Sequence, residues 1–168
     1  MSQLSEAIEK IRQLCPPALK PGLSRSEIDA LLQDFPYRLP DEVYEFYHLS
    51  NGLGEIDQFS TLFEILSLSE AVFNYRYYYE TFSGYKKEWL PLVELEDHLL
   101  VMSCNQKAHN LIDLGDNFTA CDFADDETSA LRSLRTLTTA VVSAADCFER
   151  EFKMCGRCWV RKDIFYPA

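Results

Sequence analysis

Residues 39–56 read LPDEVYEFYHLSNGLGEI, and this stretch contains the start and the end of one predicted helix. Pro40 suits the first turn of a helix, because its nitrogen carries no hydrogen and its φ is already near the helical value. Two acidic residues follow it, where the helix dipole favours negative charge. Apolar residues then recur at helical spacing, at Val43, Phe46, Tyr47 and Leu49. Asn51 and Gly52 tolerate the left-handed conformation, so we expect them to end this helix.

Similar signals predict three more helices around this stretch. Apolar residues at helical spacing predict one helix over residues 2–14 and another over residues 24–35. Ser24 and Ser67 each precede a glutamate by three residues, which is the spacing of a capping box at the start of a helix. The second of these boxes stands before a tyrosine-rich segment, where we expect the fourth helix.

Short apolar segments in the second half of the chain predict a mainly antiparallel sheet of about four to six strands. Asp, Asn or Gly residues separate these segments, which are residues 62–66, 90–95, 99–104, 111–114 and 118–123. An apolar stripe over residues 129–152 predicts a long C-terminal helix packed on the sheet. The predicted class is therefore α+β, with N-terminal helices, in a single domain over residues 1–168. Its core is expected at about residues 24–152, and the tail, residues 153–168, should add an edge strand or lie loose.

Length, charge and cysteine content restrict the classes of function. A chain of 168 residues suits one globular domain. Its 16 basic and 27 acidic residues give a formal net charge of -11 at pH 7. This charge repels nucleic acid and anionic lipid and favours a basic partner. The sequence shows neither a secretory signal nor an apolar run that could span a membrane, so we expect a cytoplasmic protein whose cysteines are reduced.

Sequence motifs give little indication of catalysis. The chain contains no phosphate-binding GxxxxGK[ST], no dinucleotide-binding GxGxxG, no HExxH and no GxSxG. We therefore assign no catalytic residue and no cofactor, and expect a protein that is not an enzyme. Cys155 and Cys158 form one CxxC pair, which can bind a metal, form a redox disulfide or be structural. Zinc would need two further ligands, so the pair is kept only as a candidate metal site.

Two segments are candidates for binding a partner protein. Six acidic residues occur between residues 108 and 131, without a Lys or Arg among them. They form a solvated loop, a docking patch that speeds the encounter with a basic protein, or a metal site, although their spacing does not match an EF-hand loop. The six residues are Asp113, Asp116, Asp122, Asp125, Asp126 and Glu127. The tyrosine-rich residues 75–85 supply either core packing or a protein interface, because tyrosine is favoured in both.

The opening stretch also resembles a known family. A Leu-Pro turn before an aromatic helix that ends in Ser-Asn-Gly is similar to the SUKH superfamily, which includes fungal cell-wall synthesis regulators and bacterial immunity proteins. The segment WLPL, residues 89–92, resembles a strand of that family, and the likeness extends over about residues 24–152. The matching positions act as turns, caps or core anchors, and they are Leu39, Pro40, Asn51, Gly52, Trp89 and Pro91. Leu53 stands where many relatives have a second glycine.

The resemblance implies an α+β domain that works by binding another protein. Its bacterial members suggest a cytosolic immunity protein that neutralises a toxin, and a charge of -11 would suit a basic, nuclease-type toxin. The alternative is a regulatory or scaffold protein of the cell-wall-regulator type. A third possibility is a zinc or redox protein that uses the C-terminal CxxC pair. Whether the protein is a monomer or a dimer is left open.

Overall fold

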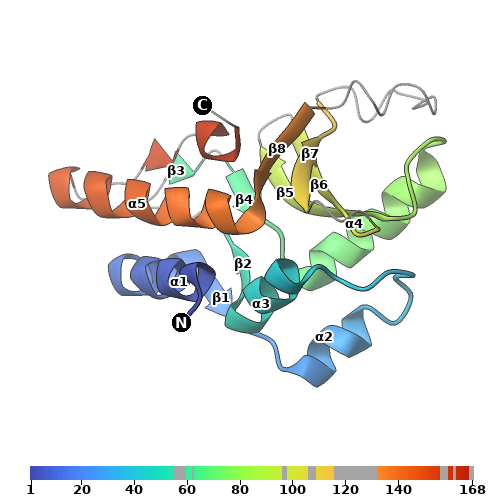
Figure 1. Ribbon diagram of the computed structural model, residues 1–168, viewed down its shortest axis with the longest axis horizontal. Helices are drawn as coiled ribbons and strands as arrows, with labels where there is room; N and C mark the ends of the chain where they lie inside the picture. The colour runs from blue at the N-terminus through green and yellow to red at the C-terminus, as the bar shows by residue number, and fades with distance from the viewer. Residues whose placement is uncertain are drawn as a thin grey trace.

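A seven-stranded antiparallel sheet with helices packed around it organises the chain (Figure 1). The computed structural model describes residues 1–54, 60–61, 63–95, 98–105, 109–115, 132–155, 159–160 and 162–166. The strand order is β1-β2-β4-β5-β6-β7-β8. The predicted α+β class is confirmed, and the sheet has one strand more than the upper end of the prediction.

The sequence predicts some of the strands better than others. Their bounds are β1 Leu19–Pro21, β2 Ser50–Leu53, β4 Phe63–Ile65, β5 Trp89–Leu95, β6 His98–Ser103, β7 Asn110–Asp113 and β8 Arg132–Thr136. The meander of β5, β6 and β7 was predicted and is confirmed. Strands β1 and β2 were not predicted, because they are short and lack apolar alternation. The predicted strand over residues 118–123 lies outside the described residues.

The five α-helices in the described part of the chain confirm most of the predicted starts. They are α1 Gln3–Leu14, α2 Arg25–Leu31, α3 Asp41–Leu49, α4 Leu68–Thr81 and α5 Leu137–Cys155. Both predicted capping boxes are present, at the first turns of α2 and α4. Helix α2 ends before the predicted residue 35, because a turn follows in which the Phe35 amide donates to the Leu32 carbonyl over 2.9 Å. This turn brings the Phe35 ring to 4.9 Å from that of Tyr75 on α4.

Asn51 and Gly52 do not end helix α3, contrary to the prediction. The helix stops at Leu49, and both residues belong to strand β2. Gly52 does adopt a positive φ of 117°, but the reason is tertiary packing. A Cβ atom there would lie 3.0 Å from the Ile65 carbonyl oxygen on the neighbouring strand.

The long C-terminal helix begins later than predicted. Residues 132–136 form β8, the last strand of the sheet, and α5 starts at Leu137. The error has a physical cause, because Leu134 in the strand and Leu137 in the helix continue the same apolar spacing. Backbone pairing with β7 decides in favour of the strand, with Ile112 opposite Ser133 and Asn110 opposite Thr136.

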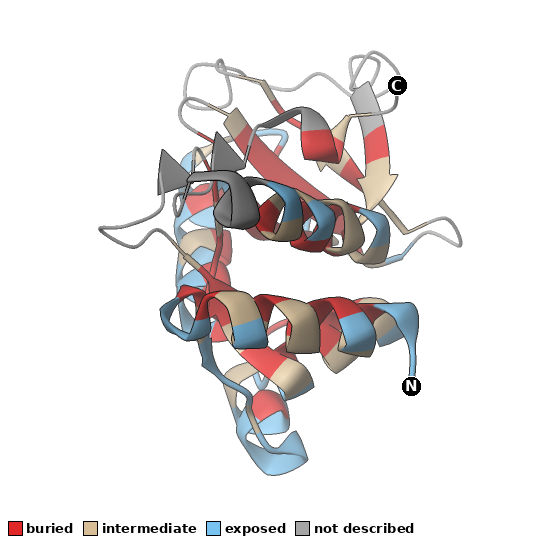
Figure 2. Cartoon of the chain, turned by 90° about the vertical axis from the view of Figure 1, so that its left-hand side faces the viewer, coloured by how far each residue is buried: buried red, intermediate tan, exposed pale blue. Residues whose placement is uncertain are grey.

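Helix α5 lies beside α1, far from it in the sequence (Figure 2). Both helices contribute buried residues, including Ile8 and Ile11 of α1 and Phe148 of α5. Lys10 of α1 also pairs with Asp146 and Glu149 of α5. These contacts join the two ends of the chain.

The C-terminal tail forms a small second sheet. Strand β9, Trp159–Val160, pairs in parallel with β3, Ser60–Thr61, and the 3-10 helix η3, Lys162–Phe165, follows it. An earlier 3-10 helix, η1, covers Pro16–Ala18. The Phe165 ring is fully buried and meets that of Phe63 edge to face at 4.9 Å. Through Phe165 the tail contributes to the core, and β9 pairs with β3 in a separate sheet instead of extending the seven-stranded one.

The central strands carry most of the core. Six of the seven residues of β5 are buried, which places apolar side chains on both faces of the sheet. Helix α4 covers part of β5 with its own buried residues, among them Leu68, Ala71 and Tyr75. Within the described part of the chain, every helix is too short or too polar to cross a lipid bilayer.

Candidate functional site

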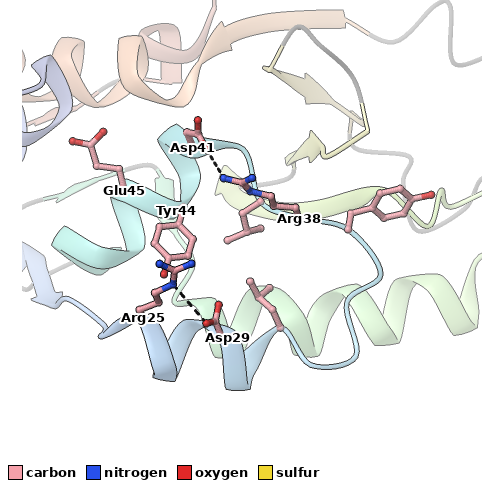
Figure 3. A pocket seen from close by; sticks show the side chains of 9 residues that line it. Arg25, Asp29, Arg38, Asp41, Tyr44 and Glu45 are labelled. Atoms are coloured by element: carbon pink, nitrogen blue, oxygen red, sulfur yellow. Dashed lines mark hydrogen bonds and ion pairs between the residues drawn. The ribbon is translucent and has the colours of Figure 1, made fainter.

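A cavity of about 640 Å³ lies between α2, the α2–α3 connection and α3 (Figure 3). Leu32, Leu39 and Tyr37 provide its apolar lining. Two ion pairs at its edge, Arg25–Asp29 at 4.0 Å and Arg38–Asp41 at 3.2 Å, are highly exposed and contribute little to stability. The lining carries both signs of charge, with Arg25 and Arg38 beside Asp29, Asp41 and Glu45. The cavity is suited to contact with another molecule.

Asp113, predicted as part of an acidic docking patch, lies at the end of β7 and is only 8% exposed. Its carboxylate accepts hydrogen bonds from the Tyr166 hydroxyl at 2.7 Å and from the Gly115 amide at 2.7 Å. His98 Nδ1 lies 3.0 Å from the same carboxylate. Burial acts to raise the pKa of Asp113, but these partners outweigh it, and the pKa is lowered. Asp113 therefore joins β6, β7 and the C-terminal tail, and little of it is available to a partner.

The other five acidic candidates lie outside the described residues. They are Asp116, Asp122, Asp125, Asp126 and Glu127. The docking patch that they would form stays a prediction.

The CxxC pair also remains a prediction. Cys155 is the last residue of α5, and Cys158 lies outside the described residues. Among the described residues, Cys15 is buried, and Cys104 and Cys147 are partly buried. Burial raises the pKa of Cys104 to about 12, so this thiol stays protonated and unreactive at neutral pH.

The family-like positions of the first half support local structure. Leu39 is buried, and Pro40 is the N-cap residue of α3. Asn51 has a role that the sequence did not indicate, because its side-chain oxygen accepts a hydrogen bond from the Leu68 amide over 2.9 Å. It thereby satisfies a free amide in the first turn of α4. Gly52 lets β2 approach the end of β4.

The family-like positions of β5 have equally structural roles. Trp89 is 2% exposed and meets Tyr85 edge to face at 5.5 Å. Pro91 occupies a place where the register with β6 shifts between residues 91 and 93. Its missing amide hydrogen is tolerated there, because an irregularity interrupts the ladder. Both residues therefore serve the packing and the geometry of β5.

The outer face of α4 carries unusually exposed aromatic side chains. Phe73 is 72% exposed and Tyr77 is 53% exposed, one turn apart on the same face. Tyr79 is 50% exposed but stacks on Tyr75 at 5.8 Å, toward a different side of the helix. The tyrosines of this segment were predicted as a possible interface, whereas Phe73 was not. A helical projection would have found it, because Phe73 lies opposite the buried residues of α4.

Taken together, these features define an α+β domain with a mixed-charge cavity and an exposed aromatic helix. Residues 22–129 match the sequence profile of the SMI1/KNR4 family (SUKH-1). Because the match covers well over half of the chain, the chain belongs to this family, as the resemblance to the SUKH superfamily predicted. The matched region ends before β8 and α5. No curated protein matches the chain.

Proposed function

We propose that this protein is a non-enzymatic protein-binding domain, and specifically a cytoplasmic immunity protein that neutralises a basic, nuclease-type bacterial toxin. Membership of the SMI1/KNR4 family supports the protein-binding role. The net charge of -11 supports the choice of a basic partner. A nuclease must attract phosphates, and the positive surface that does so is complementary to an acidic inhibitor.

The exposed aromatic face of α4 is the observation that carries the protein-binding role. Phe73 and Tyr77 keep more than half of their surface in water although they belong to a regular helix. Large aromatic side chains on a rigid element supply much of the binding energy in protein interfaces. The acidic residues 116–127 would add long-range attraction, which raises the association rate more than the final affinity.

The test is to express the chain together with any toxin domain that is encoded beside its gene. Isothermal titration calorimetry of the purified pair should show a saturable one-site complex, and co-expression should protect cells from the toxin. Cytochrome c, a basic protein of similar size, is the control for attraction by charge alone. Absence of both a complex and protection would contradict the immunity role.

A regulatory or scaffold protein of the cell-wall-regulator type is the second candidate function. The cavity between α2 and α3 favours it, because apolar residues beside both signs of charge can hold a peptide segment of a signalling protein. An isolated housekeeping locus, with a signalling protein recovered by pull-down, would support this role over immunity. A toxin gene directly upstream would support the reverse.

A further inference from the structure

We infer that the outer face of α4 is an arginine-binding surface, on which Phe73 and Tyr77 receive a guanidinium group of the partner and Glu80 pairs with it. This inference rests on the proposed protein-binding function and specifies the chemistry of its partner. The three residues are spaced by four and three positions along α4, so their side chains are neighbours on one face.

The position of the two rings on the helix is typical of a surface that contacts a partner protein. The buried residues of α4 include Leu68, Ala71 and Tyr75, which face the sheet. Phe73 and Tyr77 point away from that side, where a helix on a protein surface normally carries polar residues. Their exposed fractions are 72% and 53%, so more than half of each side chain's surface is accessible to a ligand.

Tyr77 is held in place by a series of aromatic contacts that extends into the core. Its ring lies 6.1 Å from that of Phe82, in an edge-to-face arrangement, and 5.6 Å from that of Tyr78. Tyr78 in turn meets Tyr85 at 5.7 Å, and Tyr85 meets the buried Trp89 at 5.5 Å. A ring that is already immobilised loses little conformational entropy when it binds.

The charges around this face favour a cation. Helix α4 contains one basic residue, Arg76, and it pairs with Asp34 of the segment after α2. Glu80 is exposed and makes no hydrogen bond or ion pair with any described residue. At the buried end of the aromatic series that begins with Tyr77, the Lys86 ammonium lies over the Trp89 ring at 5.9 Å.

Arginine fits this arrangement better than lysine does. Its planar guanidinium can stack on an aromatic ring and donate two parallel hydrogen bonds to a carboxylate at the same time. An ammonium group is more strongly hydrated and offers no flat face. A second copy of this chain is a poorer occupant, because a symmetric contact across α4 would bring two chains of charge -11 together.

The experiment titrates the ¹⁵N-labelled chain with N-acetylated hexa-arginine amide and, separately, hexa-lysine amide, in 0.15 M NaCl. We expect the amide signals of α4 to shift most and the arginine peptide to bind roughly two- to five-fold more tightly. The double variant Phe73→Ser/Tyr77→Ser should bind both peptides equally. Tyr79→Ser is the matched control, since it removes an equally exposed tyrosine from the same helix, and it should keep the preference.

Circular dichroism of each variant verifies the fold. The single variant Phe73→Ser leaves the aromatic contacts of Tyr77 intact, and it should already reduce the preference for the arginine peptide over the lysine peptide. Equal binding of both peptides by the unaltered chain would overturn the inference. So would a preference that survives the double variant, or a dimer in ultracentrifugation that the double variant dissociates. If a toxin domain binds without arginine selectivity, only this inference fails. If selectivity is present and no protein partner binds, the proposed function fails instead.

Discussion

Gly22 shows how a single residue sets the path of the chain. It lies between β1 and α2, and a Cβ atom there would stand 2.0 Å from the His48 carbonyl oxygen. The neighbouring Leu23 amide donates to the Tyr47 carbonyl over 2.9 Å, so the two segments cannot move apart without losing this hydrogen bond. The close approach of two backbones thus requires a residue without a side chain.

Gly22→Ala should lower the free energy of unfolding by about 2–3 kcal/mol, the usual cost of forcing extra atoms into a packed site. Urea denaturation measures the change. Gly54→Ala is the control, because its Cβ would meet only the end of the Glu64 side chain, at 3.7 Å. Equal stability of the two variants would show that the backbone around residue 22 can shift to make room for a Cβ atom at no cost in stability.

Asp113 provides a pH-dependent contribution to stability. Its pKa is lowered in the folded state, so it stabilises the fold above the pKa of the unfolded chain, about 4. That contribution is lost as the pH falls through the folded pKa. Asp113→Asn should cost about 2 kcal/mol at pH 7, because its amide would face donors that need an acceptor.

The measurement is urea denaturation of both proteins at pH 7 and at pH 3. The difference between them should narrow at the lower pH, because the unfolded chain takes up a proton at Asp113 first and the advantage of the ionised folded state then decreases. Tyr166→Phe, which removes one donor, should cost about 1 kcal/mol. A difference that stays constant down to pH 3 would contradict an ionised Asp113 in this network.

At the scale of elements, Glu42 connects α3 to α5. Its carboxylate accepts hydrogen bonds from the Thr138 amide at 2.9 Å and from the Thr138 hydroxyl at 2.7 Å. These donors lie in the first turn of α5, where the helix dipole favours a negative charge. A residue of one helix thus caps another that follows almost a hundred residues later.

Glu42→Ala should therefore lower the free energy of unfolding by about 1–2 kcal/mol. Thermal or urea denaturation gives the value. Glu42→Gln retains an acceptor oxygen and loses only the charge, so it should cost less than the alanine variant. If both variants cost the same, the charge rather than the hydrogen bond holds α5 in place.

The elements also show which features the sequence could predict. Capping boxes at Ser24 and Ser67 are local signals, and both predicted helix starts are confirmed. Strand β8 was missed because Leu134 continues the helical spacing of α5, and only pairing with β7 distinguishes the two structures. Asn51 looked like a helix stop, but its hydrogen bond to Leu68 requires the fold to exist first. Long-range contacts therefore account for most of the errors.

The same limit applies to the candidate interaction surfaces at the scale of the molecule. The net charge of -11 is visible in the sequence and indicates a basic partner. In the sequence, Asp113 cannot be distinguished from its acidic neighbours as a candidate for docking. In the fold, its carboxylate is hydrogen-bonded to Tyr166 and Gly115. Phe73 is one aromatic residue among many, and only the packing of α4 singles it out. Charge can be counted from the sequence, whereas exposure has to be read from the fold.

Long-range charge should govern how fast a basic partner is found. Replacing Asp122, Asp125, Asp126 and Glu127 by their amides removes four negative charges from one segment. We expect a slower association with the partner and a weaker dependence of its rate on salt, since the Debye length is about 8 Å at physiological ionic strength. Stopped-flow mixing at several salt concentrations measures both.

The control removes the same number of charges from exposed acidic positions elsewhere, as Glu6→Gln, Asp29→Asn, Asp41→Asn and Asp146→Asn. If net charge alone attracts the partner, the two quadruple variants will slow association equally. If the acidic segment is the docking patch, its variant will be the slower one, because steering depends on the local field at the site of contact. Unchanged association in the first variant would remove residues 122–127 from the interface and leave α4 as the principal candidate.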